Sequence, residues 1–190
     1  MVEGDLPAPV RDHLAHARVA IAVASGQADH ELIFVNAAFE QLTGYDAGEV
    51  VGRNCRMLQG RAADQPANEV ARREIRAFLS SPARANIRTV LVNFHRDGRP
   101  FVNLLYMARV RYRGNPGKFI IASQFDISHT RPELLIAYDE ALGQVVGRSD
   151  PALIDSGMVV EGSLATIGNS VAMIAQAKLM LEEMKDDPFA

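Results

Sequence analysis

The sequence is poor in cysteine, with Cys55 as the single thiol in 190 residues. One cysteine excludes an intramolecular disulfide and a cysteine-rich zinc site, so we expect no metal centre of that kind. No stretch approaches the roughly 18 apolar residues of a membrane span, and the N-terminus lacks the basic and then apolar pattern of a secretion signal. We therefore expect a cytoplasmic protein with no membrane association.

The chain also lacks an excess of positive charge: it has 20 Lys and Arg against 23 Asp and Glu, and the net charge is −3. Residues 129–190 contain ten acidic and four basic residues, so this segment carries −6 and the first 128 residues carry +3. A DNA-binding helix pair normally shows the opposite bias, because it has to neutralise phosphates. We expect no nucleic-acid partner.

Hydrophobic periodicity predicts an α+β fold. A short amphipathic helix is predicted first, and turn residues then separate the strands and helices that follow. The predicted helices lie at 8–18, 37–44, 46–52 and 68–79, and the predicted strands lie at 19–24, 31–36, 86–94, 101–113 and 118–127. This order is typical of a five-stranded antiparallel sheet with helices covering one face.

Strand signals stop after Ser128, and helices are predicted at 134–142 and from about 162 to 185. In the second helix a heptad seam of apolar residues, with Lys178 in one slot, predicts pairing with a second copy or packing back on the sheet. The apolar positions are Leu164, Ile167, Val171, Ile174 and Leu181. No histidine follows His129, which excludes the phosphoacceptor helix of a kinase, and the 61 remaining residues are too few for an ATP-binding domain. We expect no enzymatic activity, and three regions: an N-terminal helical cap (1–18), a core domain (19–128) and a C-terminal helical extension (129–190).

Cys55 lies in the run GRNCRMLQG at residues 52–60. A lone cysteine is most often an inert buried side chain. Here two arginines lie close by, which favours thiolate character. The amides of Asn54 and Gln59 can read the edge of a heteroaromatic ring. The segment is therefore a candidate ligand site.

This run resembles the signature of the LOV (light-oxygen-voltage) family of PAS-fold blue-light receptors, Gly-x-Asn-Cys-Arg-x-Leu-Gln, at every fixed position. Three further segments match the family in order: VNAAFEQLTGY at 35–45, LVNFHRDGRPFVNLLYMARV at 91–110 and IIASQFDIS at 120–128. The resemblance covers about residues 31–128. It implies a PAS/LOV fold of the bacterial short-LOV type, with helical N- and C-terminal extensions.

The resemblance also implies a function, that of a blue-light photoreceptor that binds a flavin. Cys55 would be the photoreactive thiol, which on illumination forms a reversible bond to flavin C4a while N5 gains a proton. Gln124 would lie beside N5 and switch its hydrogen bond when N5 changes from acceptor to donor. The other implied flavin-binding residues are Asn54 and Gln59 for the polar side and ribityl chain, Arg56 and Arg76 for the phosphate, and Asn93 and Asn103 for the pyrimidine ring.

Strand alternation supports a pocket independently of the resemblance. If residues 97–99 form a three-residue hairpin loop, Asn93 lies opposite Asn103 with both amides on one face. Apolar positions share that face, and on the last strand Ile120 and Ala122 share a face with Gln124. A small apolar pocket with a few placed amides is typical of a cofactor site.

The chain departs from the family pattern at a few positions. Met57 stands where many members have Phe, Phe94 where many have Tyr, and Leu105 where plant members have Phe. These exchanges are mostly apolar, and we expect them to tune lifetime or spectrum. The loop at 60–68 is slightly long but too short to require FAD, so FMN is the expected cofactor, with FAD and riboflavin as alternatives.

Signalling is expected to use the terminal helices, in a homodimer whose association or geometry changes with light, and to reach an unknown downstream protein. One alternative is a flavin-binding PAS sensor of redox state or ligand that feeds a histidine-kinase pathway and in which Cys55 is incidental. A flavoenzyme is disfavoured, because no general-base motif or Gly-x-Gly-x-x-Gly fingerprint occurs. For the heptad seam, packing within one chain remains the alternative to dimerisation.

Overall fold

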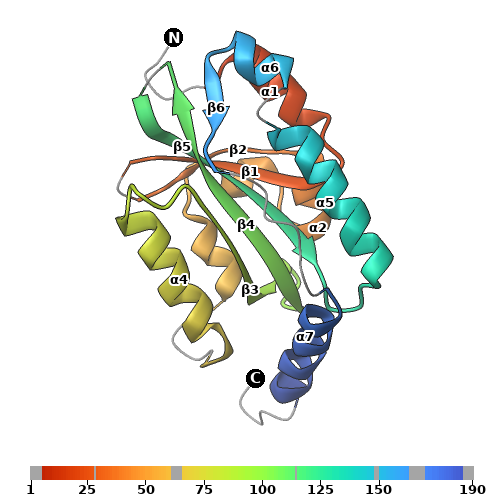
Figure 1. The fold of residues 1–190 in the computed structure, drawn as a ribbon. Coiled ribbons are helices and arrows are strands. Elements are labelled where there is room, and N and C mark those ends of the chain that lie inside the picture. Colours follow the sequence, from red (N-terminus) through yellow and green to blue (C-terminus); the bar gives the residue numbers. More distant parts are fainter. Residues whose placement is uncertain are drawn as a thin grey trace.

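The computed structural model describes residues 6–27, 29–60, 66–113, 115–147, 150–162 and 170–185 (Figure 1). The helices are α1 (Ala8–Ala15), α2 (Ala37–Thr43), α3 (Ala47–Val50), the 3-10 helices η1 (Cys55–Gln59) and η3 (Pro66–Asn68), α4 (Glu69–Ser80), α5 (Pro132–Val146), α6 (Pro151–Asp155) and α7 (Ser170–Lys185). The strands are β1 (Ala20–Ser25), β2 (Leu32–Val35), β3 (Asn86–Phe94), β4 (Pro100–Tyr112), β5 (Asn115–Asp126) and β6 (Met158–Val160). None of the helices within these ranges is long and apolar enough to cross a bilayer.

The strands form one antiparallel sheet in the order β2-β1-β5-β4-β3, and β6 pairs with the end of β4 that extends past β3. The α+β fold and its five principal strands are confirmed. The expectation that no strand follows Ser128 was wrong, since β6 makes a sixth strand. Its three residues are too few to show a periodic signal, and the strand exists because Val160 can pair with Val110 on β4.

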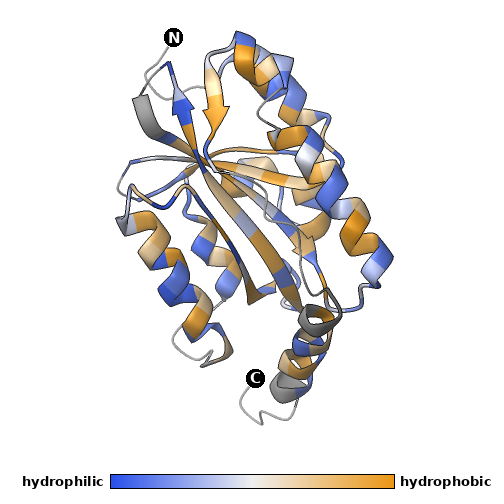
Figure 2. Ribbon diagram, viewed as in Figure 1, coloured by the Kyte–Doolittle hydropathy of each residue, from blue (hydrophilic) through white to orange (hydrophobic). Residues whose placement is uncertain are grey.

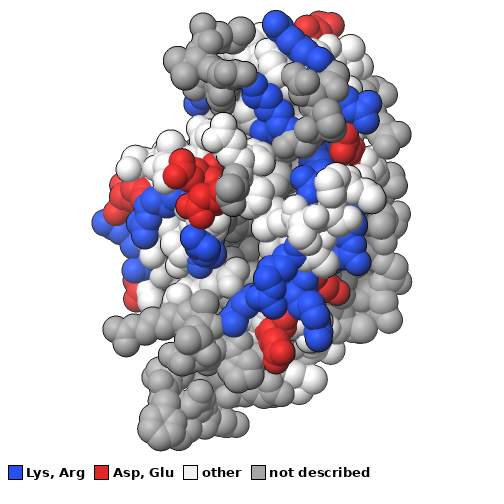
Figure 3. Space-filling view, turned by 90° about the vertical axis from the view of Figure 1, so that its left-hand side faces the viewer, with Lys and Arg blue, Asp and Glu red and all other residues white. Residues whose placement is uncertain are grey.

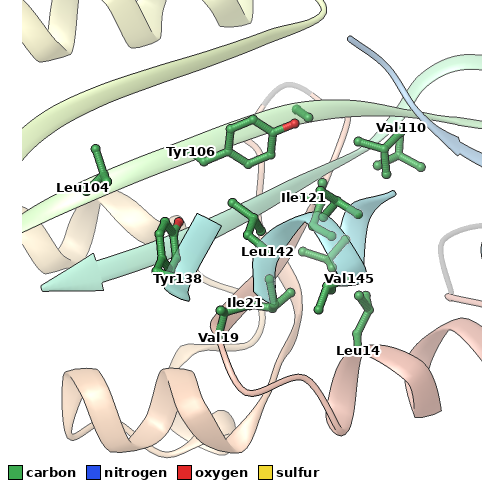
Figure 4. Packing of buried hydrophobic residues seen from close by; sticks show 14 of the residues in the cluster. Leu14, Val19, Ile21, Leu104, Tyr106, Val110, Ile121, Tyr138, Leu142 and Val145 are labelled. Atoms are coloured by element: carbon green, nitrogen blue, oxygen red, sulfur yellow. The ribbon is translucent and has the colours of Figure 1, made fainter. Parts of the chain in front are cut away.

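Helices cover both faces of the sheet. On one face lie α2, α3, η1 and α4, and on the other lie the terminal helices α1, α5 and α7, as the positions of α4 and α5 show in Figure 1. The strands are rich in hydrophobic residues (Figure 2), and these contribute to cores on both faces of the sheet. The larger core lies under the terminal helices (Figure 4) and includes Val10, Leu14, Ile21, Leu104, Tyr106, Ile121, Tyr138 and Leu142. The predicted single covered face holds only for the helices of the central domain.

A buried asparagine joins the N-terminal helix to the sheet. Asn36 is 2% exposed, and it caps α2 by accepting a hydrogen bond from the Phe39 N–H. Its Oδ1 also accepts from the Ile21 N–H, and its Nδ2 donates to the carbonyls of Leu14, Ala17 and Val19. One side chain thus makes hydrogen bonds to backbone groups of three segments and ties them together.

Helix α4 is fixed at both ends. At its N-terminus the Asn68 side chain donates to the Val92 carbonyl over 2.8 Å and accepts from the Val92 N–H. At its C-terminus the guanidinium of the buried Arg109 donates to the carbonyls of Phe78, Leu79, Ser81 and Arg84. The carbonyls of Phe78 and Leu79 lie in the last turn of α4, where a helix leaves carbonyls without helical partners, so Arg109 acts as a C-terminal cap and also ties the following loop to the helix.

The β3–β4 hairpin differs from the predicted three-residue loop. Phe94 pairs with Pro100 and Leu91 pairs with Asn103, so the loop runs from 95 to 99 and Asn93 lies opposite Phe101. The loop is closed by a hydrogen bond from the His95 N–H to the Arg99 carbonyl. Because the register differs from the prediction by two residues, an even number, Asn93 and Asn103 still share one face.

Helix α7 folds back on its own chain. Its buried residues are Ile174, Ala177 and Met180, and the helix contacts β4 and α5. Lys178 is exposed and lies outside this buried stripe, whereas the prediction placed it in the apolar seam. Leu164, Ile167 and the Val171 side chain lie outside the described part. Packing against a sheet needs only one narrow stripe per helix, which i, i+3, i+6 spacing supplies.

Candidate functional site

A cavity of about 690 Å³ lies between the sheet and the helices η1 and α4. Its floor is made of small and apolar side chains, including Ala22 and Ala24 of β1, which leave room above the sheet. All eight site residues predicted from the sequence line this one cavity: Asn54, Cys55, Arg56, Gln59, Arg76, Asn93, Asn103 and Gln124. Its volume lies in the usual range for small-molecule sites, roughly 300–1,000 Å³.

Three buried amides in this cavity each keep one polar atom without a hydrogen-bond partner: Asn93 Oδ1, Asn103 Nδ2 and Gln124 Oε1. The Phe125 N–H donates to Asn103 Oδ1 over 3.1 Å, which fixes the orientation of that amide. A buried polar atom without a partner costs roughly 1–3 kcal/mol. Together the three atoms present a donor and two acceptors to whatever fills the cavity.

Cys55 opens η1, and its place is set by neighbouring backbone contacts. Asn54 caps this helix, since its Oδ1 accepts from the Arg56 N–H over 2.9 Å. The helix ends at Gly60, whose φ of +65° suits glycine, and any Cβ there would lie 3.1 Å from the Phe94 ring. These constraints bring Cys55 Sγ to 3.8 Å from Gln124 Nε2 across the cavity.

The Cys55 thiol is protonated at neutral pH. Burial raises its pKa to about 11, and the hydrogen bond from Gln124 opposes this only in part. The interpretation of Cys55 as a thiolate among cations was therefore wrong. The physical reason is the burial of the thiol. The Arg56 guanidinium contacts the Asp29 carboxylate at the exposed rim instead, over 3.0 Å.

The rim of the cavity is basic and is joined to the β1–β2 loop. Asn54 Nδ2 donates to the Asp29 carbonyl over 2.5 Å, which joins this amide to the loop. Four arginines line the cavity (Arg53, Arg56, Arg72 and Arg76), and basic side chains surround a hollow on the α4 side of the molecule (Figure 3). An anionic group on a ligand would be favoured here.

The central part of the chain, residues 19–129, matches the family model described as PAS domain. This chain belongs to the PAS family. Among known proteins, this PAS chain is 34% identical over 114 residues to the blue light receptor lreA of Aspergillus flavus, covering 55% of this chain and 13% of that protein. It is also 34% identical over 123 residues to blue-light-activated histidine kinase 2 of Erythrobacter litoralis, and the match covers 64% of this chain and 34% of that protein. The chain thus spans about a third or less of the lengths of these relatives.

Solved structures of LOV proteins share this PAS fold. The crystal structure of the Rhodobacter sphaeroides LOV protein superposes with a TM-score of 0.66 at 24% identity, over 93% of this chain and 94% of that chain. An RNA-binding light-oxygen-voltage receptor matches with a TM-score of 0.55 at 34% identity, over 74% of this chain and 36% of that chain. The first match extends the likeness of fold to the terminal helices, and together with the blue-light relatives the second confirms the resemblance to the LOV family.

Sequence reasoning missed three charged residues of the PAS pocket. Arg72 precedes Arg76 by one helical turn, so the spacing on α4 would have identified it. Arg53 lies inside the recognised run. Asp29 had no local signal, since only the folding of the β1–β2 loop over η1 brings it to Arg56.

In the described part of the chain, no cluster of His, Cys, Asp and Glu could hold a metal ion.

The protonated thiol gives a testable pH dependence. In the dark, the rate of Cys55 alkylation by iodoacetamide should rise about tenfold per pH unit between pH 7 and 9.5 without a plateau, because the thiolate fraction grows in that proportion below a pKa of about 11. Mass spectrometry would measure the rate, and Cys55→Ser, which leaves no cysteine, gives the background. A plateau below pH 9, as for an exposed thiol with a pKa of about 8.5, would contradict the assignment.

Proposed function

We propose that this PAS protein is a LOV blue-light photoreceptor whose cavity holds a flavin. The observation that carries the proposal is the set of three buried amide atoms without partners, at Asn93, Asn103 and Gln124, which face the same cavity as the single thiol. The edge of a flavin's pyrimidine ring offers both donors and acceptors, so amides that offer both kinds of group complement it. The relatives named blue-light receptors support the same conclusion.

A bound flavin, excited by blue light, would supply an electrophilic ring carbon, C4a, for a reversible bond to the Cys55 sulfur, and the proton of the thiol would pass to the ring nitrogen N5. The chain holds the sulfur at one place beside the apolar floor, and it keeps the proton on that sulfur until the reaction. Gln124 has Nε2 near the sulfur and Oε1 uncommitted, so its amide can donate or accept at the adjacent ring nitrogen.

FMN is the proposed cofactor, with FAD and riboflavin as alternatives. Arg56 and Arg76 line the cavity and can make charge-assisted hydrogen bonds to a terminal phosphate. Arg56 lies 3.0 Å from the Asp29 carboxylate, so a phosphate would share or replace Asp29 as the partner of this guanidinium. Asn54 and Gln59 line the same cavity and are proposed to bind the ribityl side.

The proposed organisation has a helical cap at 1–18, a sensor domain at 19–128 and a helical extension at 129–190. We propose that the chain turns over no substrate, works in the cytoplasm as a homodimer through its terminal helices, and signals to a partner protein. Three large apolar side chains on α5 and α7 remain more than half exposed and are available to a second copy: Leu134, Ile136 and Leu179.

Replacing the thiol tests the photochemistry. Cys55→Ser should keep the yellow flavin and lose the bleaching of its blue absorption that reverses in the dark, because no other thiol exists in the chain. Met57→Leu removes the other sulfur of η1 and should keep the bleach. Absorption spectra before and after blue light measure both. A wild-type protein that binds flavin but does not bleach would instead favour the redox or ligand sensor, and bleaching in Cys55→Ser would refute the role of the thiol.

Removing the basic rim tests the choice of cofactor. Arg56→Ala combined with Arg76→Ala should shift the bound pool from FMN toward riboflavin, because two partners for the phosphate are lost. Chromatography of the released flavin measures the pool. Arg99→Ala, on the β3–β4 hairpin and outside this cavity, is the control and should leave the pool unchanged. Equal FMN occupancy in the double variant and the wild type would overturn the assignment.

Light scattering after size-exclusion chromatography tests the dimer. The wild type should be dimeric in the dark, and blue light should change its elution. Leu179→Gln, on the exposed side of α7, should weaken the dimer because its apolar contact is lost, whereas Val70→Gln, equally exposed but on α4, should not. A monomer in the dark and in the light at tens of micromolar would overturn the proposed homodimer.

A further inference from the structure

The two neighbours of Gln124 on β5 are both held by one residue of the C-terminal extension. Gln124 faces the cavity, so Ser123 and Phe125 face the opposite side of the sheet, where α5 lies. The Tyr138 hydroxyl of α5 donates to Ser123 Oγ over 3.0 Å. The Tyr138 ring stacks on the Phe125 ring with 4.5 Å between centroids and 16° between planes. Figure 4 shows Tyr138 between α5 and the strands.

Tyr138 is itself firmly placed. It is 4% exposed, and its neighbour Asp139 forms a largely buried ion pair with Arg88 of β3, with 2.7 Å between Arg88 Nη2 and Asp139 Oδ1. The Arg88 guanidinium lies over the ring of Tyr106, which is the cross-strand partner of Ser123. Burial raises the pKa of Tyr138 to about 12, so its hydroxyl keeps its proton and remains a donor at neutral pH.

We infer that Tyr138 is a positioning residue for the light reaction: it holds the backbone on both sides of Gln124 and so links the orientation of that amide to the docking of α5. The inference rests on the proposed photoreceptor function. A strand held at both neighbours cannot adjust at Gln124 without moving the contact on its other face, because the strand and the packed core around it are continuous. Coupling of this kind is reciprocal. If the state of Gln124 changes the docking of α5, then weakening the Tyr138 contact changes the relative stability of the Gln124 states.

The test uses the full chain with bound flavin. Tyr138→Phe keeps the ring stack and removes the hydroxyl, and Ser123→Ala removes the acceptor from the other side. Each should change the rate of dark recovery by about three- to tenfold, the range that corresponds to one net hydrogen bond. The two changes combined should have the effect of one, since both delete the same bond. Each should also shift the side-chain amide carbonyl band of Gln124 in light-minus-dark infrared spectra, which a loss of stability alone would not do.

Tyr112→Phe is the matched control. It removes a hydroxyl from a tyrosine near the far end of β4, where the ring meets Phe119 rather than a neighbour of Gln124, and it should recover like the wild type. Wild-type recovery and an unshifted amide band in Tyr138→Phe, or additive effects of the two variants, would overturn the inference. A wild type that never bleaches would instead refute the proposed function.

A second measurement needs no variant. Hydrogen exchange of the wild type should show faster exchange of α5 (Pro132–Val146) under blue light than in the dark, because the Tyr138 contact is weakened when the Gln124 amide reorients. The exchange of α4, which lies on the other face, provides the internal comparison. Equal exchange of α5 in the dark and in the light, in a protein that does bleach, would also overturn the inference.

Discussion

The alternation of side chains along β5 is the constraint on which the rest of the structure depends. Successive residues must face opposite sides of the sheet. Alternate residues of β5 therefore line the cavity on one side and pack into the core on the other. Gln124 contributes to the cavity, while Ser123 and Phe125 contribute to the core under α5. The cavity and the core under the terminal helices therefore share one strand, with no intervening loop.

The cavity itself is maintained at a cost in stability. Amide atoms of Asn93, Asn103 and Gln124 are buried without partners, and the Cys55 thiol is kept protonated by burial. A ligand that satisfies the amides recovers part of this cost, so binding and folding stabilise each other. The surrounding supports explain why the cavity does not collapse. Arg109 caps α4 on one side, and Asn54 and Gly60 fix the ends of η1 on the other.

The terminal segments are integral parts of one core. Helix α1 is joined to the sheet through Asn36, β6 extends the sheet beside β4, and α7 buries Ile174, Ala177 and Met180 against β4 and α5. Any change in the docking of α5 must be accommodated by this shared packing. A change in the docking of α5 would therefore alter the packing of the other terminal elements as well.

The sequence by itself determined the α+β fold and the five principal strands through local periodicity, and its resemblance to the LOV family in four segments identified eight residues of the cavity. Even the wrong hairpin register left Asn93 and Asn103 on the correct face, since the error was an even number of residues. Tertiary structure alone decided the rest. The protonation of Cys55 depends on burial, the partnership of Asp29 with Arg56 depends on a loop folding over η1, and the exposure of Lys178 depends on which side of α7 meets the sheet. Strand β6 and the contact of Tyr138 with both neighbours of Gln124 join segments distant in the chain, and such pairings leave no periodic trace in a single sequence.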